Sequence, residues 1–211
     1  MSKTVSKSVK FWDRFAHKYS LGPIAKPQIY EKKLEMTRQY LKPGMDVLEF
    51  GCGTGSTAIL HAPHVKHFKA TDYSQNMIAI GKQKALYNNI QNITFECAEV
   101  MDLDPQKEQY DVILGLNVLH LLQDKEAVLR KVHCLLKPGG VFVSSTACLE
   151  DHVFLKYLKY IAPLGHFLGL IPFVRSFSKN DLMGLHEKIG FKNEVVWSPD
   201  VGSLFLVVRK S

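Results

Sequence analysis

The chain has 211 residues, of which 46% are hydrophobic and 22% are charged, and its formal net charge at pH 7 is +7. This length predicts a single domain, and this composition excludes a disordered chain and allows a sizeable core. The four cysteines are scattered, with no Cys-x-x-Cys pair and no zinc-ligand spacing, which argues against a disulfide scaffold and a metal site. The positive charge favours anionic partners but leaves nucleic acid, anionic lipid and acidic metabolites open.

The N-terminal residues and the most apolar segment argue against a secreted protein and a membrane-spanning protein. Residues 1–7 lack an apolar stretch, so we expect no secretory signal and a cytoplasmic location with reduced thiols. Residues 153–174 are the most apolar part of the chain, but proline, glycine and lysine interrupt them. A bilayer-spanning helix needs about 20 mostly apolar residues, so this segment is a poor candidate.

Taken in chain order, the elements predicted from the sequence begin with two helices, over residues 9–20 and 28–41. Strands and helices then alternate, which predicts a parallel sheet with helices on both faces. The last two strands are joined by a short turn and should be antiparallel to each other. The predicted strands are 45–50, 66–71, 93–97, 110–115, 141–146, 191–197 and 203–209, and the later helices are 56–61, 74–87, 124–136 and 179–189.

A glycine-rich turn between the first strand and the next helix is the most informative motif. It reads Glu49-Phe50-Gly51-Cys52-Gly53-Thr54-Gly55. Such a turn lets a ligand approach the backbone and offers it the N–H groups at a helix start. The dinucleotide pattern would need a further glycine where Ser56 stands, and the Glu49 carboxylate would repel a pyrophosphate but suits an ammonium group. The turn therefore points to a cationic nucleoside without phosphates, and S-adenosylmethionine fits that description.

Four motifs in order resemble the class I S-adenosylmethionine-dependent methyltransferases, and in particular the small-molecule group that contains the ubiquinone and menaquinone methyltransferases. They span residues 47–55, 70–74, 110–113 and 136–140. The resemblance implies a Rossmann-like, seven-stranded, mostly parallel sheet with an antiparallel last strand. It also implies S-adenosylmethionine as cofactor, S-adenosylhomocysteine (SAH) as product, and no metal.

The resemblance also implies a division of the single domain. Residues 1–42 would form helices covering the site, residues 43–147 the cofactor-binding core and residues 148–178 an apolar lid. Residues 179–211 would complete the domain with a helix and a hairpin.

The carboxyl ends of the strands should hold the cofactor, because open parallel sheets bind ligands there. Asp72, at the end of the second strand, is expected to bind the ribose hydroxyls, as acidic residues do in dinucleotide folds. Tyr73 and Met77 either pack on the adenosine or face the core. We predict a cofactor site made by Tyr19, Glu49, Gly51, Cys52, Gly53, Gly55, Asp72, Tyr73, Met77, Ala98, Glu99 and Asn117.

Some of these roles come from the resemblance alone. It places Ala98 and Glu99 at the adenine ring, with Asp102 as the alternative acid. It places Asn117 at the methionine end, and Tyr19 where relatives close an aromatic side chain over the cofactor. His120, just after the fourth strand, is the candidate general base, because histidine can take a proton near neutral pH; the alternative is a space-filling histidine.

The acceptor is less defined. The apolar character of the lid, 148–178, suits a small apolar or lipid-like acceptor, and Lys156 and Lys159 add charge that could face an anionic membrane through residues 149–177. Alternatively, these residues only pack on the sheet. A nucleic-acid methyltransferase is disfavoured because no base-stacking stripe is present, and a non-catalytic binding protein stays open. His61, His64 and His67 are expected to be solvated loop residues rather than metal ligands.

Overall fold

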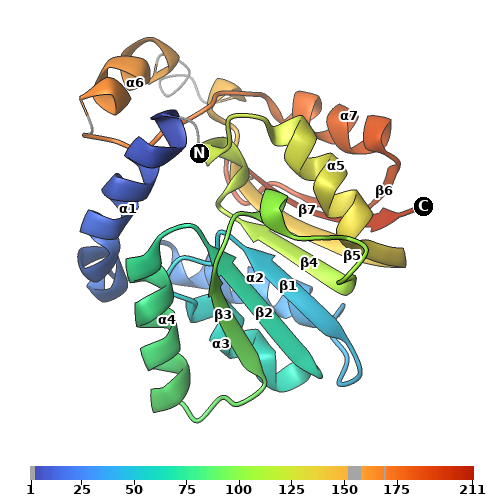
Figure 1. Ribbon diagram of the computed structural model, residues 1–211. Coiled ribbons are helices and arrows are strands. Elements are labelled where there is room, and N and C mark those ends of the chain that lie inside the picture. The colour runs from blue at the N-terminus through green and yellow to red at the C-terminus, as the bar shows by residue number, and fades with distance from the viewer. Residues whose placement is uncertain (1–2, 152–157, 169) are drawn as a thin grey trace.

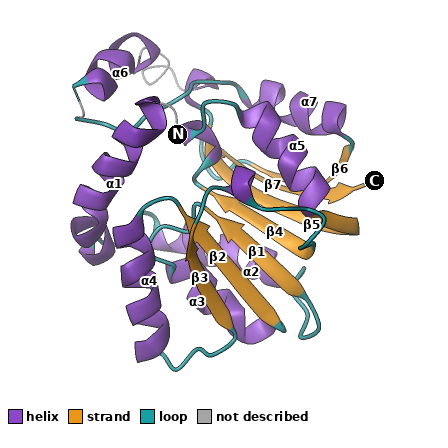
Figure 2. Ribbon diagram, viewed as in Figure 1, coloured by secondary structure: helices purple, strands orange, loops and turns teal. Residues whose placement is uncertain are grey.

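A seven-stranded sheet organises the molecule, with helices packed on both of its faces (Figures 1 and 2). The computed structural model describes residues 3–151, 158–168 and 170–211. The strand order is β3-β2-β1-β4-β5-β7-β6, in which β7 is antiparallel to both of its neighbours and the other pairings are parallel. The predicted Rossmann-like sheet with an antiparallel last strand is therefore confirmed.

The elements follow the predicted order with shifted ends. The helices are α1 (Lys3–Leu21), α2 (Pro27–Arg38), α3 (Ser56–His61), α4 (Gln75–Tyr87), α5 (Lys125–Leu135), α6 (Leu158–Phe167) and α7 (Lys179–Ile189). The strands are β1 (Asp46–Phe50), β2 (His67–Asp72), β3 (Ile93–Cys97), β4 (Tyr110–Leu116), β5 (Leu136–Ala147), β6 (Phe191–Trp197) and β7 (Ser203–Lys210). In the described ranges, single-turn 3₁₀ helices lie among them at Ala62–His64, Val100–Asp102, Leu119–Leu121 and Leu149–Asp151.

Three boundaries differ clearly from the prediction, and the first has a visible cause in the strand pairing. β5 begins at Leu136 rather than at residue 141, because Leu136 already pairs with Tyr110 before the register shifts. The Lys137–Gly140 segment is a bulge inside the strand instead of a loop in front of it. α1 starts about two turns earlier than expected, and α2 ends at Arg38 instead of Leu41.

Side chains alternate between the two faces of the sheet and build two cores. On one face Val47, Val141 and Val143 pack with α3 and α4, and on the other Leu48, Ile113 and Phe142 pack with α5 and α7. Figure 2 shows α2 and α3 behind the sheet and α5 and α7 in front of it. This alternation also assigns a face to every polar side chain at the carboxyl ends of the strands.

Hydrogen bonds connect the N-terminal helix to the start of α4, near the predicted site. Asp13 Oδ1 on α1 accepts hydrogen bonds from Ser74 Oγ at 2.6 Å and from the Asn76 N–H at 3.2 Å. Ser74 is the N-cap of α4, as predicted, because its Oγ accepts from the Met77 N–H. Figure 1 shows α1 between α4 and α6, at the end of the sheet where the site lies.

Candidate functional site

The glycine-rich turn joins β1 to α3 in a closely packed conformation with left-handed backbone angles. Gly51, Gly53 and Gly55 have φ values of 62°, 54° and 71°, all in the left-handed region that favours glycine. A Cβ atom on Gly51 would lie 2.5 Å from Val118, and one on Gly55 would lie 2.5 Å from the Phe95 ring. The turn therefore needs glycine for its backbone conformation. It also needs glycine because Val118, after β4, and Phe95, in β3, leave no room for a Cβ atom.

Asp72 connects this turn to the start of α4. Its Oδ2 accepts from the Gly53 N–H at 2.9 Å and its Oδ1 accepts from the Ser74 N–H at 2.8 Å. Burial raises the pKa of Asp72, and these two backbone bonds oppose that rise. Each carboxylate oxygen retains further acceptor capacity, so Asp72 can still bind a pair of hydroxyl groups.

Glu49 is a buried acid at the end of β1. Glu49 is 3% exposed, and within the described residues its Oε2 atom has no hydrogen-bond partner. Burial, and then the charge of Asp72, raise its pKa to about 8. An unpartnered buried carboxyl group is costly, and a cation beside it would favour its charged form. The Glu49 carboxylate therefore suits the ammonium group of S-adenosylmethionine, from which it can accept a hydrogen bond.

Tyr19 lies over the turn and faces both acids. A Cβ atom built on Gly53 would be 3.8 Å from the Tyr19 ring. Burial raises the pKa of the Tyr19 hydroxyl, and the charges of Glu49 and then Asp72 raise it further. Half of the residue remains exposed. α1 thus places an aromatic ring beside the glycine turn, and its role over a cofactor stays a prediction.

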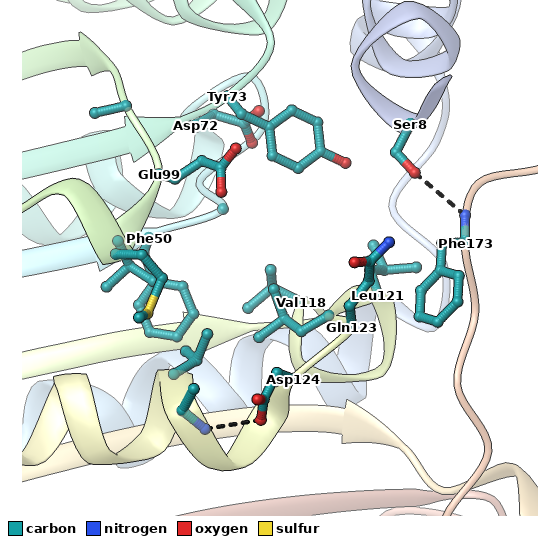
Figure 3. A pocket seen from close by; sticks show the side chains of 17 residues that line it. Ser8, Phe50, Asp72, Tyr73, Glu99, Val118, Leu121, Gln123, Asp124 and Phe173 are labelled. Atoms are coloured by element: carbon teal, nitrogen blue, oxygen red, sulfur yellow. Dashed lines mark hydrogen bonds between the residues drawn. The ribbon is translucent and has the colours of Figure 1, made fainter. Parts of the chain in front are cut away.

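A cavity of about 240 Å³ opens on the other side of the turn (Figure 3). Asp72, Tyr73 and Glu99 lie on one side of it, and Val118 and Leu121 lie opposite them. Its volume is near the lower end of small-molecule sites, at about 300 Å³. The lining residues are Ser8, Phe50, Gly51, Asp72, Tyr73, Ala98, Glu99, Val100, Met101, Val118, Leu121, Leu122, Gln123, Asp124, Ala127, Val128 and Phe173.

The cavity collects only part of the predicted cofactor site. Ala98 and Glu99 line it, whereas the alternative acid, Asp102, is exposed and accepts a hydrogen bond from the Glu99 N–H. Met77 lies outside the lining and is 2% exposed, in keeping with the core alternative. Cys52 donates its N–H to the Thr71 carbonyl, which fixes the turn to β2.

The two predicted residues after β4 differ in their surroundings. Asn117 is exposed, has a φ of 57°, and donates its N–H to the Ser145 carbonyl at 2.6 Å. His120 is largely buried and its Nδ1 lies 3.3 Å from Thr146 Oγ1. Burial lowers the pKa of His120 to about 4, so its ring is neutral at pH 7 but is a weaker base than an ordinary histidine. Its role as a base stays a prediction.

The site spans both faces of the sheet. Glu49 follows Leu48 and therefore points to the α2 and α3 face, whereas Phe50 points to the α5 face and lines the cavity. A ligand crossing the end of β1 would meet Asp72 and the turn between these two sides. The arrangement suits an elongated molecule with a flat apolar end in the cavity and a cationic end at Glu49.

Several lining residues were not expected from the sequence. Ser8 comes from α1, Gln123 follows β4, and Phe173 belongs to the predicted lid. Ser8 Oγ and the Phe173 N–H are 3.4 Å apart, which joins the N-terminal helix to the lid across the cavity (Figure 3). The sequence signal for Phe173 was the apolar lid itself, but no local pattern indicated Ser8.

The lid carries exposed apolar side chains instead of packing wholly on the sheet. They lie on α6 and the residues after it and are Tyr160, Leu164, Phe167, Leu168 and Leu170. Lys7 on α1 lies 4.4 Å from the centre of the Phe167 ring and donates to the Phe167 carbonyl. Lys156 lies outside the described residues, as does the side chain of Lys159.

No helix in the described part of the chain is both long and apolar enough to cross a bilayer. The same residues contain no group of three or more histidine, cysteine or acidic side chains arranged to hold a metal ion. His61 corrects the expectation of solvated histidines, because it is fully buried on α3 and neither ring nitrogen has a partner among the described residues.

The sequence profile of a family described as "Methyltransferase domain" matches residues 25–196. Two curated relatives are each 27% identical to the chain. One is the ubiquinone biosynthesis O-methyltransferase of Coxiella burnetii, aligned over 64% of this chain and 56% of that protein. The other is the demethylmenaquinone methyltransferase of Listeria monocytogenes, aligned over 63% of this chain and 60% of that protein. The chain thus spans less than two thirds of the length of these relatives.

Solved structures share the fold at lower identity. The magnesium protoporphyrin IX methyltransferase of Synechocystis PCC 6803 with bound SAH superposes with a TM-score of 0.73. The two chains cover each other completely and are 21% identical. At this identity the likeness concerns the fold.

Proposed function

Because the chain belongs to the class I S-adenosylmethionine-dependent methyltransferases, we propose that it transfers the cofactor's methyl group to a small, largely apolar acceptor. The match of residues 25–196 to the methyltransferase family confirms the resemblance that the four motifs indicated. The single observation that carries the cofactor assignment is Glu49, a buried carboxyl group whose Oε2 atom has no hydrogen-bond partner among the described residues, beside a glycine turn. A phosphate ligand would be repelled there, and an ammonium group would be bound.

Each part of the site has a role in this proposal. Glu49 binds the ammonium group, Asp72 the ribose hydroxyls, and the cavity lined by Phe50 and Val118 takes the adenine ring. Glu99 lies at the cavity edge where it can accept a hydrogen bond from an exocyclic amine. Tyr19 covers the turn and excludes water.

Bound S-adenosylmethionine would supply a methyl group activated by its sulfonium. Direct displacement needs no nucleophile from the protein, so this chain's residues align the two reactants and keep the pocket dry. His120 is our candidate for taking the acceptor's proton, because its ring is neutral at pH 7.

The names of the curated relatives support an aromatic, lipid-like acceptor. One relative is a ubiquinone biosynthesis O-methyltransferase and the other a demethylmenaquinone methyltransferase. The apolar side chains on the lid are consistent with such an acceptor. A cytoplasmic protein working as a single domain completes the proposal.

Calorimetry and turnover test it in two steps. Titrations with S-adenosylmethionine, SAH and NAD should give heat with the first two, and heat with NAD alone would overturn the cofactor assignment. Incubation with methyl-tritiated S-adenosylmethionine and a lipid extract should then move label into the organic phase. Label transferred only to added tRNA or DNA would favour a nucleic-acid methyltransferase, and binding without transfer to any of these pools would favour a non-catalytic protein.

We also propose that the exposed apolar lid docks on an anionic bilayer. Leu164, Phe167, Leu168 and Leu170 are exposed beside the cationic Lys7, and this combination suits an acyl boundary beneath acidic headgroups. Co-sedimentation with phosphatidylglycerol vesicles should be lost in Leu164→Asp. The matched variant Leu86→Asp, at another exposed leucine, should sediment as wild type does. Equal sedimentation of both variants would contradict the docking.

A further inference from the structure

Lys33 is a half-buried lysine that α2 carries to the carboxyl end of β5. Its ammonium group donates a hydrogen bond to Ser145 Oγ at 2.7 Å, across 112 residues of sequence. Ser145 is 1% exposed and pairs with Leu116, the last residue of β4. Ser145 Oγ in turn lies 3.4 Å from the side-chain oxygen of Asn117. Lys33 therefore reaches the strand ends where the acceptor has to approach.

No carboxylate of the described residues forms an ion pair with Lys33. Burial lowers the pKa of Lys33, and the charge of Asp200 opposes that effect. Asp200 is itself paired with Lys26 at 2.6 Å. A half-buried cation with a neutral hydroxyl as its hydrogen-bond partner is short of a counter-charge. A ligand with a negative oxygen would supply one.

The same face of α2 also reaches the cofactor residues. Tyr30, one helical turn before Lys33, lies 3.2 Å from Thr57 Oγ1, and the charge of Glu49 contributes to the raised pKa of its hydroxyl. Glu49 and Ser145 point to this face from β1 and β5, with only β4 between the two strands. Ordinary strand spacing puts them roughly 10–12 Å apart. The gap between Ser145, which Lys33 contacts, and Glu49, the proposed ammonium site, is therefore wide enough for one small molecule.

We propose that Lys33 binds the methyl acceptor through a negatively charged oxygen, so that the enzyme selects phenols and enols over alcohols and amines. The inference rests on the proposed function and names the acceptor class for the same site. The Lys33 ammonium group donates a hydrogen bond to the acceptor's oxyanion. The oxyanion thereby replaces Ser145 Oγ as the main hydrogen-bond partner of Lys33.

The chemistry balances without a further reactant. The acceptor's hydroxyl proton passes to His120, the proposed base, and from there to bulk water as the oxyanion forms beside Lys33. An oxygen lone pair then bonds to the methyl carbon, and the electron pair of the broken carbon–sulfur bond stays on sulfur. The negative charge on oxygen and the positive charge on sulfur disappear together, and Lys33 keeps its proton throughout.

A chromogenic phenol tests this without relying on turnover. 4-Nitrocatechol changes its visible absorbance when it ionises, and it can be titrated from pH 5 to 9 in the presence of protein and SAH. Opposite charge at a few ångströms lowers a pKa by about 1–3 units, so bound probe should ionise about one pH unit lower than free probe. Lys33→Met and Lys33→Gln should abolish most of that shift, and Lys33→Arg should restore part of it.

Lys32 provides the matched control. Its side chain lies over the Trp197 ring, 4.6 Å from the ring centre, and Lys32→Met should shift the probe as wild type does. The other groups able to act on the probe are Asp200, Lys26, Tyr30 and Glu49, and each is retained in all four variants.

The outcomes separate this inference from the proposed function. SAH binding is measured by calorimetry in the same samples. If SAH fails to bind wild type, the proposed function is wrong. If SAH binds but the probe does not bind, or ionises alike in wild type and Lys33→Met, Lys33 does not select an oxyanion and the inference is overturned.

Discussion

The affinity for S-adenosylmethionine is expected to rise with pH because of Glu49. Burial, and then the charge of Asp72, raise the Glu49 pKa to about 8 in the free protein. The ion pair with the cofactor's ammonium group needs the carboxylate form. Binding therefore lowers the Glu49 pKa and releases its proton at pH values below about 8 and above the pKa of the bound state.

The size of the effect follows from that pKa. Because one unit corresponds to about 1.4 kcal/mol, ionising Glu49 costs about 1.4 kcal/mol at pH 7 and about 2.7 kcal/mol at pH 6. The apparent dissociation constant should thus fall about tenfold between these two values, with close to one proton released per molecule bound. The gain ends near pH 8, where the cofactor's α-amino group, with an ordinary pKa of about 7.7–8.0, loses its own proton.

Calorimetry between pH 6 and 7, in buffers of different ionisation enthalpy, measures both quantities. Glu49→Gln is the matched variant, because glutamine has the same shape and cannot titrate; its affinity should be weak and independent of pH. His61 and His120 should not contribute, since burial lowers their pKa values to about 3 and about 4. An affinity that is flat in wild type, or a tenfold rise that persists in Glu49→Gln, would refute the reasoning.

Further substitutions test the rest of the site. Asp72→Ala should weaken cofactor binding by more than tenfold in calorimetry. Asp72→Asn should also weaken binding, and because its NH2 group cannot accept, one of the bonds from the Gly53 and Ser74 N–H groups is lost and the thermal transition should fall as well; unchanged affinity in both variants would remove the ribose role. Gly51→Ala should destabilise the protein by roughly 1–3 kcal/mol in urea unfolding, because the left-handed φ and the contact with Val118 both oppose a Cβ atom. Glu49→Gln should be more stable than the free wild type. The folded state holds the Glu49 proton more tightly than the unfolded chain, so wild type loses about 1.4 kcal/mol per pH unit between about pH 5 and 8. His120→Ala should bind cofactor normally and turn over slowly; normal turnover would make His120 a structural residue.

Local sequence signals predicted the elements well where they depend on nearby residues. The glycine turn, the Ser74 cap and the first strand, which ends at Phe50, follow from conformational preference and from short apolar runs. The start of β5 was missed, because the pairing of Leu136 with Tyr110 is a contact between distant segments. α6 was missed because proline and glycine interrupt the apolar run of residues 153–174.

The sequence by itself determined the sheet, the turn and the acids at the strand ends, since each of these depends on residues within one element. Only the tertiary structure decided that Tyr19 covers the turn, that His61 is buried, and that Lys33 reaches Ser145. These meetings join side chains from elements far apart in the chain. Packing of the helices on the sheet sets them, and neither hydrophobic period nor local propensity encodes which distant side chain will fill a given position.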